Sequence, residues 1–511
     1  RKMITWENIN KLLISEETVE NYRELESFCN ECLRQTEADE QMKNLLEKQF
    51  VQMLTKETMY DGYFIFLLSF LMKAFQKEQY VELFLEVVGS QPELTPVNKI
   101  FILHQVKTLF INYPKLKTEQ VGHQITELEG NIRAYLENTI KTERVTREQR
   151  TENLVFVMVA GFLGENHPVS RSALERCYML QKQAGKRVRL ISAGESCTMQ
   201  DAIPMYQIQV RNRAEEYTGM KQYKYLGEQI ELYQSEVPAD SLEGLQKLMQ
   251  YITAERPEYI LYVGEQSFVA DMANKVCPVI TISSTFSAIQ NTRTEFLMTG
   301  RKVSDSERKM LYPDVIEIPF TFQLKKRKQT HTRSMLKIPE NRFVLVVVGM
   351  RLDADVTDEF LKNIKTEIDN GCYLVFIGKY DKYQINCEKY SWLLENSVSL
   401  GVIDDVAGVL PVLDLYINPF RLGGGYSVAE AFDAGIPVVS INYGDVATAA
   451  GKDFCVETYE QMNETIEKYR TEPEFYQQMV KEGEKRLAEL TDEEGAFLRG
   501  LEIALKSSRF Y

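Results

Sequence analysis

The stretch "NPFRLGGGYSVAEAFDAGIPVVS", residues 418–440, combines a glycine-rich bend, a helix and a strand. Gly423, Gly424 and Gly425 let the backbone turn with no Cβ in the way, and "VAEAFDA" after them has a helical pattern. "IPVVS" is a continuous apolar run with β-branched residues, which is typical of a buried parallel strand. The stretch therefore predicts one unit of an α/β sheet.

Further units of the same kind surround it. Strand-like and helical stretches alternate over residues 153–283 and again over residues 342–441. This order predicts two doubly wound parallel-sheet domains facing a cleft, with ligands at the carboxyl ends of the strands. The domains are placed at 151–330 and 331–485. An all-helical domain precedes them at 1–150, and a C-terminal helix, expected to pack on the outside, follows at 486–511.

Composition excludes several classes of partner. The 511 residues carry a formal net charge of −14, so we expect no general affinity for nucleic acid or anionic membranes. The basic run at 325–328 is interpreted as a solvated linker. The apolar stretch at 63–72 is shorter than the roughly 20 residues of a membrane span, and no secretory signal opens the chain. We therefore expect a cytoplasmic protein with no transmembrane segment.

The cysteines point to a reducing compartment. Eight are scattered along the chain, and only Cys29 and Cys32 form a C-x-x-C pair, which lies in a helical pattern without a second pair. We interpret them as small core residues and expect no metal site and no cofactor.

The glycine bend is suited to binding an anion. With Ser427 as the expected N-cap, the helix would start with free N–H groups that favour an anion, and the glycines would let a diphosphate approach the backbone. Tyr426 lies in the same turn. Glu430 follows Ser427 by three residues, so it either forms a capping box or presents a carboxylate to a ribose diol.

The second half of the chain, over roughly residues 335–485, resembles the donor-binding half of GT-B-fold glycosyltransferases, especially family 4. In that family a "P…G…EA…G.PVV" stretch ends the donor pocket, and "GGGYSVAEAFDAGIPVVS" is similar to it. The resemblance implies a nucleotide-sugar donor, most often a UDP-sugar, and places Glu430 on the nucleotide ribose. "VVVGMRLD" resembles the family's "vGRL", which places Arg351 facing the donor diphosphate.

Two positions depart from the family pattern. The glutamate that contacts the sugar in retaining enzymes corresponds here to Leu422, and a lysine five residues after the arginine corresponds to Val356. Lys379 or Arg421 would supply the missing positive charge. These departures leave inversion or retention of stereochemistry open.

The helical domain in front of the sheets allows a second comparison. Relatives of O-linked N-acetylglucosamine transferase share the GT-B fold, and the bacterial adhesin N-glucosyltransferases also place an all-helical domain before it. The similarity is architectural and has no motif behind it. It points to a protein as one acceptor class beside a glycan, and to the helical domain as a site for oligomer or partner contacts.

Candidate acid–base groups lie on the N-terminal side of the expected cleft. "GFLGENHPVSR" follows the first strand of the N-terminal sheet and contains Glu165 and His167, which are candidates for activating or positioning an acceptor. Asp445, in the loop after the last strand, is a candidate sugar contact. The "DAD" at 353–355 is interpreted as helix capping and not as a metal site.

The sequence therefore predicts a metal-independent glycosyltransferase, with the donor on the C-terminal domain and the acceptor on the N-terminal one. Two alternatives stay open. A sugar-nucleotide 2-epimerase shares the fold and needs no acceptor. A catalytically degenerate GT-B chain would serve as an interaction subunit, consistent with Leu422 and Val356 in place of charged residues.

Overall fold

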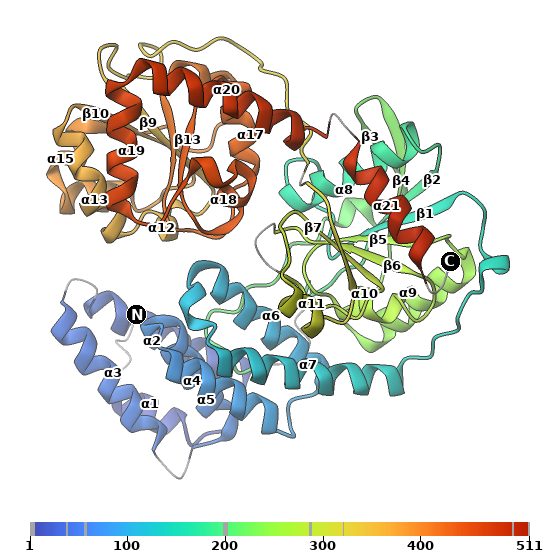
Figure 1. Cartoon of the computed structure of the whole chain (residues 1–511). Helices are drawn as coiled ribbons and strands as arrows, with labels where there is room; N and C mark the ends of the chain where they lie inside the picture. Colours follow the sequence, from blue (N-terminus) through green and yellow to red (C-terminus); the bar gives the residue numbers. More distant parts are fainter. Residues whose placement is uncertain are drawn as a thin grey trace.

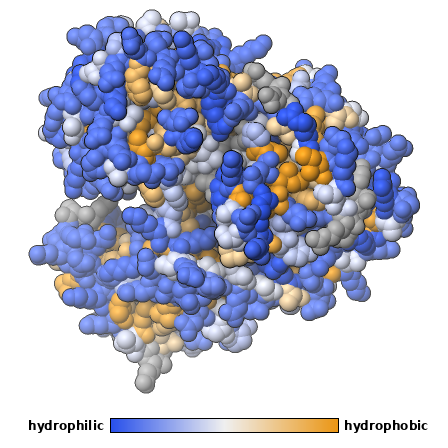
Figure 2. All heavy atoms as spheres, in the orientation of Figure 1, coloured by the Kyte–Doolittle hydropathy of each residue, from blue (hydrophilic) through white to orange (hydrophobic). Residues whose placement is uncertain are grey.

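The computed structural model describes residues 6–36, 39–55, 59–197, 203–285, 289–319, 321–492 and 495–508. Figure 1 shows three parts along the chain: a helical domain, an N-terminal α/β domain and a C-terminal α/β domain. Figure 2 shows mostly hydrophilic residues on the same face, and the surface is hollowed between the helical domain and the C-terminal domain.

The helical domain is built from amphipathic helices around one very apolar helix. Its helices are α1 (Trp6–Leu12), α2 (Val19–Thr36), α3 (Glu40–Leu54), α4 (Asp61–Phe75), α5 (Glu78–Ser90), α6 (Pro96–Asn112) and α7 (Glu119–Thr139). Side-chain caps fix several starts, as where Thr95 accepts the N–H of Asn98 at α6. Residues 63–72 lie inside α4 and are buried, and within the described chain no helix combines the length and apolar character of a bilayer span.

The cysteines behave as core residues. All eight are free and six are buried, among them Cys29 and Cys32 on α2. Over the described ranges no group of three or more metal-ligating side chains comes together.

The N-terminal α/β domain contains an eight-stranded sheet in the order β3-β4-β2-β1-β5-β6-β7-β8, parallel except for β3. Its strands are β1 (Leu154–Val159), β2 (Arg187–Ser192), β3 (Gly219–Tyr225), β4 (Glu228–Gln234), β5 (Ile260–Val263), β6 (Val279–Ile282), β7 (Phe296–Thr299) and β8 (Asp314–Glu317). Its helices are α8 (Pro168–Lys182), α9 (Leu242–Glu255), α10 (Phe268–Ala273) and α11 (Asp305–Met310). Every residue of β1 is buried, as its unbroken apolar run predicts.

The C-terminal α/β domain contains a six-stranded parallel sheet in the order β11-β10-β9-β12-β13-β14. Its strands are β9 (Phe343–Gly349), β10 (Cys372–Gly378), β11 (Ser397–Ser399), β12 (Leu415–Asn418), β13 (Val438–Ile441) and β14 (Cys455–Val456). Its helices are α12 (Leu352–Asp355), α13 (Asp358–Asp369), α14 (Tyr383–Lys389), α15 (Ser391–Asn396), α16 (Val406–Val409), α17 (Tyr426–Asp433), α18 (Gly444–Ala450), α19 (Tyr459–Thr471) and α20 (Pro473–Leu490). The predicted fold class, two doubly wound parallel-sheet domains after a helical one, is confirmed.

The β3–β4 hairpin is a feature that the sequence analysis missed. Its turn is formed by Leu226 and Gly227, whose φ angles are 48° and 86°. A tight hairpin needs positive φ at both central residues, and glycine supplies it without strain. Short two-residue turns of this kind join antiparallel strands, so β3 runs against the otherwise parallel sheet.

The C-terminal end of the chain ties the two α/β domains together. Helix α20 packs on α17 and continues across the expected boundary between 485 and 486. Helix α21 (Ala496–Ser507) then lies on the N-terminal α/β domain (Figure 1), where Phe497 and Leu501 enter its core. The guanidinium of Arg176, on α8, lies 4.5 Å from the centre of the Phe497 ring.

The helical domain shares a core with the N-terminal α/β domain. The ring of Tyr206 lies 4.9 Å from that of Phe70, and its hydroxyl donates to Asn30 Oδ1 at 2.6 Å. A buried ion pair joins the same two parts, with Arg133 Nε 2.8 Å from Asp271 Oδ2. Apolar packing and a paired buried charge together fix the helical domain against the sheet.

Replacing Phe497 with alanine tests the docking of α21. We expect Phe497→Ala to lower the free energy of unfolding by about 3–5 kcal/mol, because the ring is fully buried. Ile503→Ala on the same helix is the control; that side chain is 60% exposed, so the change should stay within about 0.5 kcal/mol. Urea denaturation measures both. Equal stability of the two variants would contradict the observed packing.

Candidate active site

The glycine bend lies between β12 and α17. Gly424 has φ +110°, a conformation that disfavours any residue with a Cβ. The backbone N–H groups of Gly423, Gly424 and Gly425 donate no hydrogen bond to any described residue. Three donors at the start of a helix are therefore available to an anion, as the sequence predicts.

The prediction that Ser427 caps this helix is wrong. Helix α17 begins at Tyr426 after Gly425, without a side-chain cap. Ser427 lies inside the first turn, where its Oγ donates to the Gly424 carbonyl at 2.7 Å and lies 2.8 Å from the Tyr416 hydroxyl. A capping box between Ser427 and Glu430 is therefore absent from this described turn, which leaves the Glu430 carboxylate for another purpose.

Arg421 is a structural residue of the bend. Its side chain is 2% exposed and donates to Asn418 Oδ1 (2.5 Å), the Val348 carbonyl (2.7 Å), the Tyr416 hydroxyl (2.9 Å) and Asp355 Oδ2 (3.3 Å). An arginine has five N–H donors, so four are engaged within the chain. The sequence analysis predicted Arg421 in the donor site. In the structure its side chain instead holds the ends of β9, β12 and α12 together.

Glycines make room for this guanidinium. A Cβ on Gly349 would lie 2.3 Å from Arg421 Nη1, and a Cβ on Gly424 would lie 3.0 Å from Nη2. A Cβ on Gly444 would lie 2.2 Å from the Arg421 carbonyl oxygen. The three glycines come from β9, the bend and α18, so the close approach of these elements around Arg421 requires glycine at each.

Arg351 is the cation that faces the bend. A Cβ on Gly423 would lie 3.1 Å from Arg351 Nη2, so the guanidinium lies directly against the glycines. Burial lowers the pKa of Arg351, while Asp355 and Asp445 act against that shift. Asp445 is buried at the start of α18, and its N–H donates to the Leu422 carbonyl at 2.6 Å. Arg351, Asp445 and the bend thus come together as the sequence predicts.

Other predicted cations and capping residues lie elsewhere. Lys379 is exposed and its Nζ lies 3.4 Å from Asp381. Val356, at the position of the family lysine, is buried in the core. The capping interpretation of "DAD" is wrong, since Asp353 accepts the N–H of Lys382 at 2.7 Å and Asp355 pairs with Arg421. Thr357 caps α13 in their place.

Tyr426 and Glu430 connect the bend to the N-terminal domain. The Tyr426 ring lies 4.1 Å from the guanidinium carbon of Arg171, on α8, and its hydroxyl donates to the Gln323 carbonyl at 3.2 Å. Glu430, one turn deeper, is 8% exposed. Burial raises its pKa to about 7, and Arg171 and Lys325 partly oppose the shift.

The predicted acid–base residues have different environments. His167 caps α8, and its Nδ1 accepts the N–H of Ser170 at 3.4 Å. Burial lowers its pKa, so the ring is neutral and keeps Nε2 for another contact. Glu165 is exposed, and its backbone N–H donates to the Tyr223 hydroxyl at 3.2 Å.

The sequence analysis missed two carboxylates at the same edge of the N-terminal sheet. Glu195 follows β2, and its Oε1 accepts hydrogen bonds from Ser267 Oγ (2.7 Å) and the Tyr262 hydroxyl (3.2 Å). Glu265 follows β5 and accepts hydrogen bonds from Ser284 Oγ, Gln290 Nε2 and Thr285 Oγ1, the last at 3.3 Å. Burial raises the pKa of both carboxyls.

A sequence signal for them exists. A Gly-Glu pair follows three strands of this sheet, at 164–165, 194–195 and 264–265. The sequence analysis predicted only Glu165 of the first pair as a site residue, because His167 lies close to it. Since parallel strands end at one edge of the sheet, the repeated pair predicts carboxylates gathered there.

The C-terminal α/β domain is similar to a known protein family. Residues 342–471 match the family model described as Glycosyl transferases group 1. This range covers β9 to α19 and includes Arg351, the glycine bend, Glu430 and Asp445. The chain therefore carries a group 1 glycosyltransferase domain at its C-terminal end. No curated protein sequence matches the chain.

Several solved structures are similar to part of the chain. A glycosyltransferase from Rickettsia africae ESF-5 is 13% identical with a TM-score of 0.49, covering 70% of this chain and 100% of that one. HepE of Anabaena, in complex with UDP and glucose, is 12% identical with a TM-score of 0.49 and the same coverage. The pneumococcal O-GlcNAc transferase GtfA, in complex with UDP and GlcNAc, is 8% identical with a TM-score of 0.45, again covering 70% and 100%.

Removing Arg421 tests its structural role in the group 1 domain. We expect Arg421→Leu to lower the free energy of unfolding by about 3–5 kcal/mol, because Asp355 would stay buried without its partner. Lys485→Leu, which removes a cation from an exposed pair with Glu482, is the control and should cost less than about 1 kcal/mol. Thermal and urea unfolding measure both. An Arg421→Leu protein as stable as the parent would refute the role.

Proposed function

We propose that the chain is a glycosyltransferase that moves a sugar from a nucleotide-sugar donor to an acceptor, with UDP as the nucleotide. The observation that carries the proposal is the juxtaposition of Arg351 with three unoccupied backbone N–H groups at 423–425, inside a group 1 glycosyltransferase domain. A diphosphate leaving group needs this combination of fixed dipoles and one cation. Glu430, one turn deeper, is proposed to accept the ribose hydroxyls.

The acceptor is proposed to lie on the N-terminal domain. His167, Glu195 and Glu265 follow strands of one sheet edge, and each has a pKa shifted by burial. Such groups are suited to removing a proton from an acceptor near neutral pH. The reaction is proposed to need no metal and no cofactor.

One observation favours a second candidate, an interaction subunit that has lost catalysis. Arg421 is engaged internally and Val356 lies in the core, so neither adds to the charge with which Arg351 would neutralise a diphosphate. A thermal-shift screen against UDP, GDP, ADP and TDP sugars separates the two. A shift with one nucleotide supports the transferase and identifies its donor, whereas no shift with any of them favours the subunit.

Arg351 is expected to dominate donor affinity. Arg351→Ala should weaken UDP binding about 10- to 100-fold, because a charge-assisted contact to phosphate is lost. Glu430→Ala should weaken it less, by about 3- to 10-fold, since a hydroxyl contact is weaker than an ionic one. Lys365→Ala, on the exposed side of α13, is the control. Calorimetry with UDP measures all three, and unchanged affinity in both site variants would show that the pocket is elsewhere.

Donor binding should depend on pH through Glu430. Its pKa near 7 means that the carboxylate, the form that accepts ribose hydroxyls, prevails only above that pH. We expect UDP affinity to rise between pH 6 and 8 in the parent relative to Glu430→Gln, because the titration of UDP itself is common to both. Parallel profiles would exclude a ribose contact.

The raised pKa of Glu430 also predicts a pH dependence of folding stability, which can be measured without nucleotide. Since the folded state holds a proton that the unfolded state has released, the stability from Glu430 is lost as pH rises through about 7. Glu430→Gln should flatten that part of the stability profile.

A further inference from the structure

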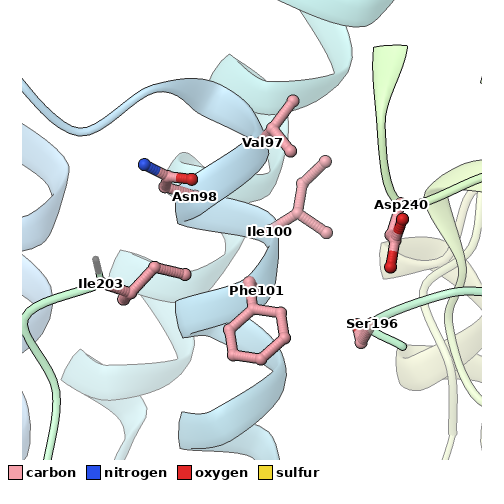
Figure 3. Close-up of a pocket in the computed structure, with 7 residues that line it drawn as sticks. All are labelled: Val97, Asn98, Ile100, Phe101, Ser196, Ile203 and Asp240. Carbon is pink, nitrogen blue, oxygen red and sulfur yellow. The ribbon is translucent and has the colours of Figure 1, made fainter. Parts of the chain in front are cut away.

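A small pocket lies between the helical domain and the N-terminal α/β domain, away from the glycine bend. Figure 3 shows Val97, Asn98, Ile100 and Phe101 of α6 on one side, with Ser196 and Asp240 across from them. An adjoining pocket of about 30 Å³ shares four of these residues and extends to Glu195, Leu245 and Phe268. Both exist only because α6 is docked against the sheet.

The pocket lies at the edge of the sheet where ligands are expected. Ser196 follows β2, Asp240 follows β4, and Phe268 begins the helix after β5. These are carboxyl ends of parallel strands, the usual ligand-binding edge of an open α/β sheet. The helical domain therefore supplies one wall of the acceptor side.

The walls are held rigidly. Lys107 on α6 donates to Gln266 Oε1 at 2.8 Å, in the loop after β5, and pairs with Glu129 of α7 at 2.5 Å. Arg133 of α7 pairs with Asp271 of α10 at 2.8 Å. A pocket formed by cross-linked elements is preorganised, so binding needs little ordering of the protein.

The chemistry of the walls is aliphatic with a polar rim. Val97 and Ile100 supply branched apolar surface. The rings of Phe101 and Phe268 are only 5% and 7% exposed, so they offer little flat surface on which a sugar could stack. A volume near 30 Å³ admits the end of one aliphatic side chain and is too small for a hexose ring.

Two charged groups at the rim have unused hydrogen-bonding capacity. Glu195 Oε2 accepts no hydrogen bond from the described residues. Arg211 is next to the pocket, since its backbone N–H donates to the Ser196 carbonyl at 2.9 Å, and its positive charge acts on the Glu195 carboxyl without a hydrogen bond between them in the described ranges. A carboxylate that accepts and a guanidinium that donates match the N–H and C=O of a peptide backbone.

We propose that this pocket binds an aliphatic side chain of a polypeptide acceptor, with Glu195 and Arg211 contacting the backbone beside it. The proposal deepens the proposed function and rests on it. It assigns the acceptor to polypeptides and gives the helical domain a part in selecting them.

Peptide binding, which needs no sugar transfer, tests the proposal. The probes are labelled nine-residue peptides with a central Ser, Thr or Asn, in which each flanking position is in turn Ala, Val, Leu, Phe or Lys. Fluorescence polarisation with the full chain measures affinity. At one flanking position, Val or Leu should bind about tenfold tighter than Ala or Lys, as expected for burying two or more methyl groups.

Pocket variants show where the peptide binds. Ile100→Trp fills the pocket and should remove the preference, while Val51→Trp, on the exposed face of α3, is the matched control. Val97→Glu, which places a charge in the pocket, should act in the same direction if the tryptophan disturbs folding. UDP affinity should be unchanged in all three.

Several results would overturn the proposal: no aliphatic preference, a preference that survives both pocket variants, or pocket-dependent binding of oligosaccharides in place of peptides. Failure of UDP to bind the parent, with peptide binding intact, would instead refute the proposed transferase while leaving the peptide site.

Discussion

The guanidinium of Arg421 is the contact on which the shape of the glycine bend depends. It reaches a carbonyl at the end of β9, two side chains of β12 and the carboxylate of Asp355 on α12. The acceptors on Asn418, Tyr416 and Asp355 belong to buried residues, so each of these would carry a desolvation cost if the arginine were absent. Glycine at 349, 424 and 444 follows from this arrangement, because a Cβ at any of them would press on Arg421 or its backbone.

This internal use of one arginine explains how the bend differs from a flexible loop. The three glycines are often taken as a sign of freedom, yet Gly424 is held at φ +110° against a fixed side chain. The N–H groups of the bend are consequently preorganised, and fixed dipoles stabilise a developing charge better than mobile ones. Arg351 lies against Gly423 and faces the bend.

Much of the fold could be predicted from periodicity alone. Strands buried on both faces, such as β1 and β9, are continuous apolar runs with little ambiguity. The β3–β4 hairpin was missed because its strands are half-exposed at the sheet edge and its turn, Leu226-Gly227, lacks the usual Asn or Asp. Local pattern carries little information where burial is partial.

The site was predictable in position and less so in the role of each residue. The order strand, bend, helix located the donor side, because that geometry follows from chain connectivity. Whether a charged residue such as Arg421 faces ligand or core depends on acceptors far away in sequence, at Val348 and Asp355. Ser427 was misjudged for a similar reason, since the helix begins at Tyr426 after Gly425, two residues earlier than a cap at Ser427 would place it.

The two halves of the site are connected by contacts that do not belong to either sheet. Tyr426, at the start of α17, packs under Arg171 of α8 and binds the segment between the domains, while α21 returns to bury Phe497. On the other side, α6 and α7 are cross-linked to the loop after β5. Arg171, at the start of α8, and Gln266, in the loop after β5, both follow strands at the carboxyl edge of the N-terminal sheet, so this edge carries contacts to both neighbouring domains.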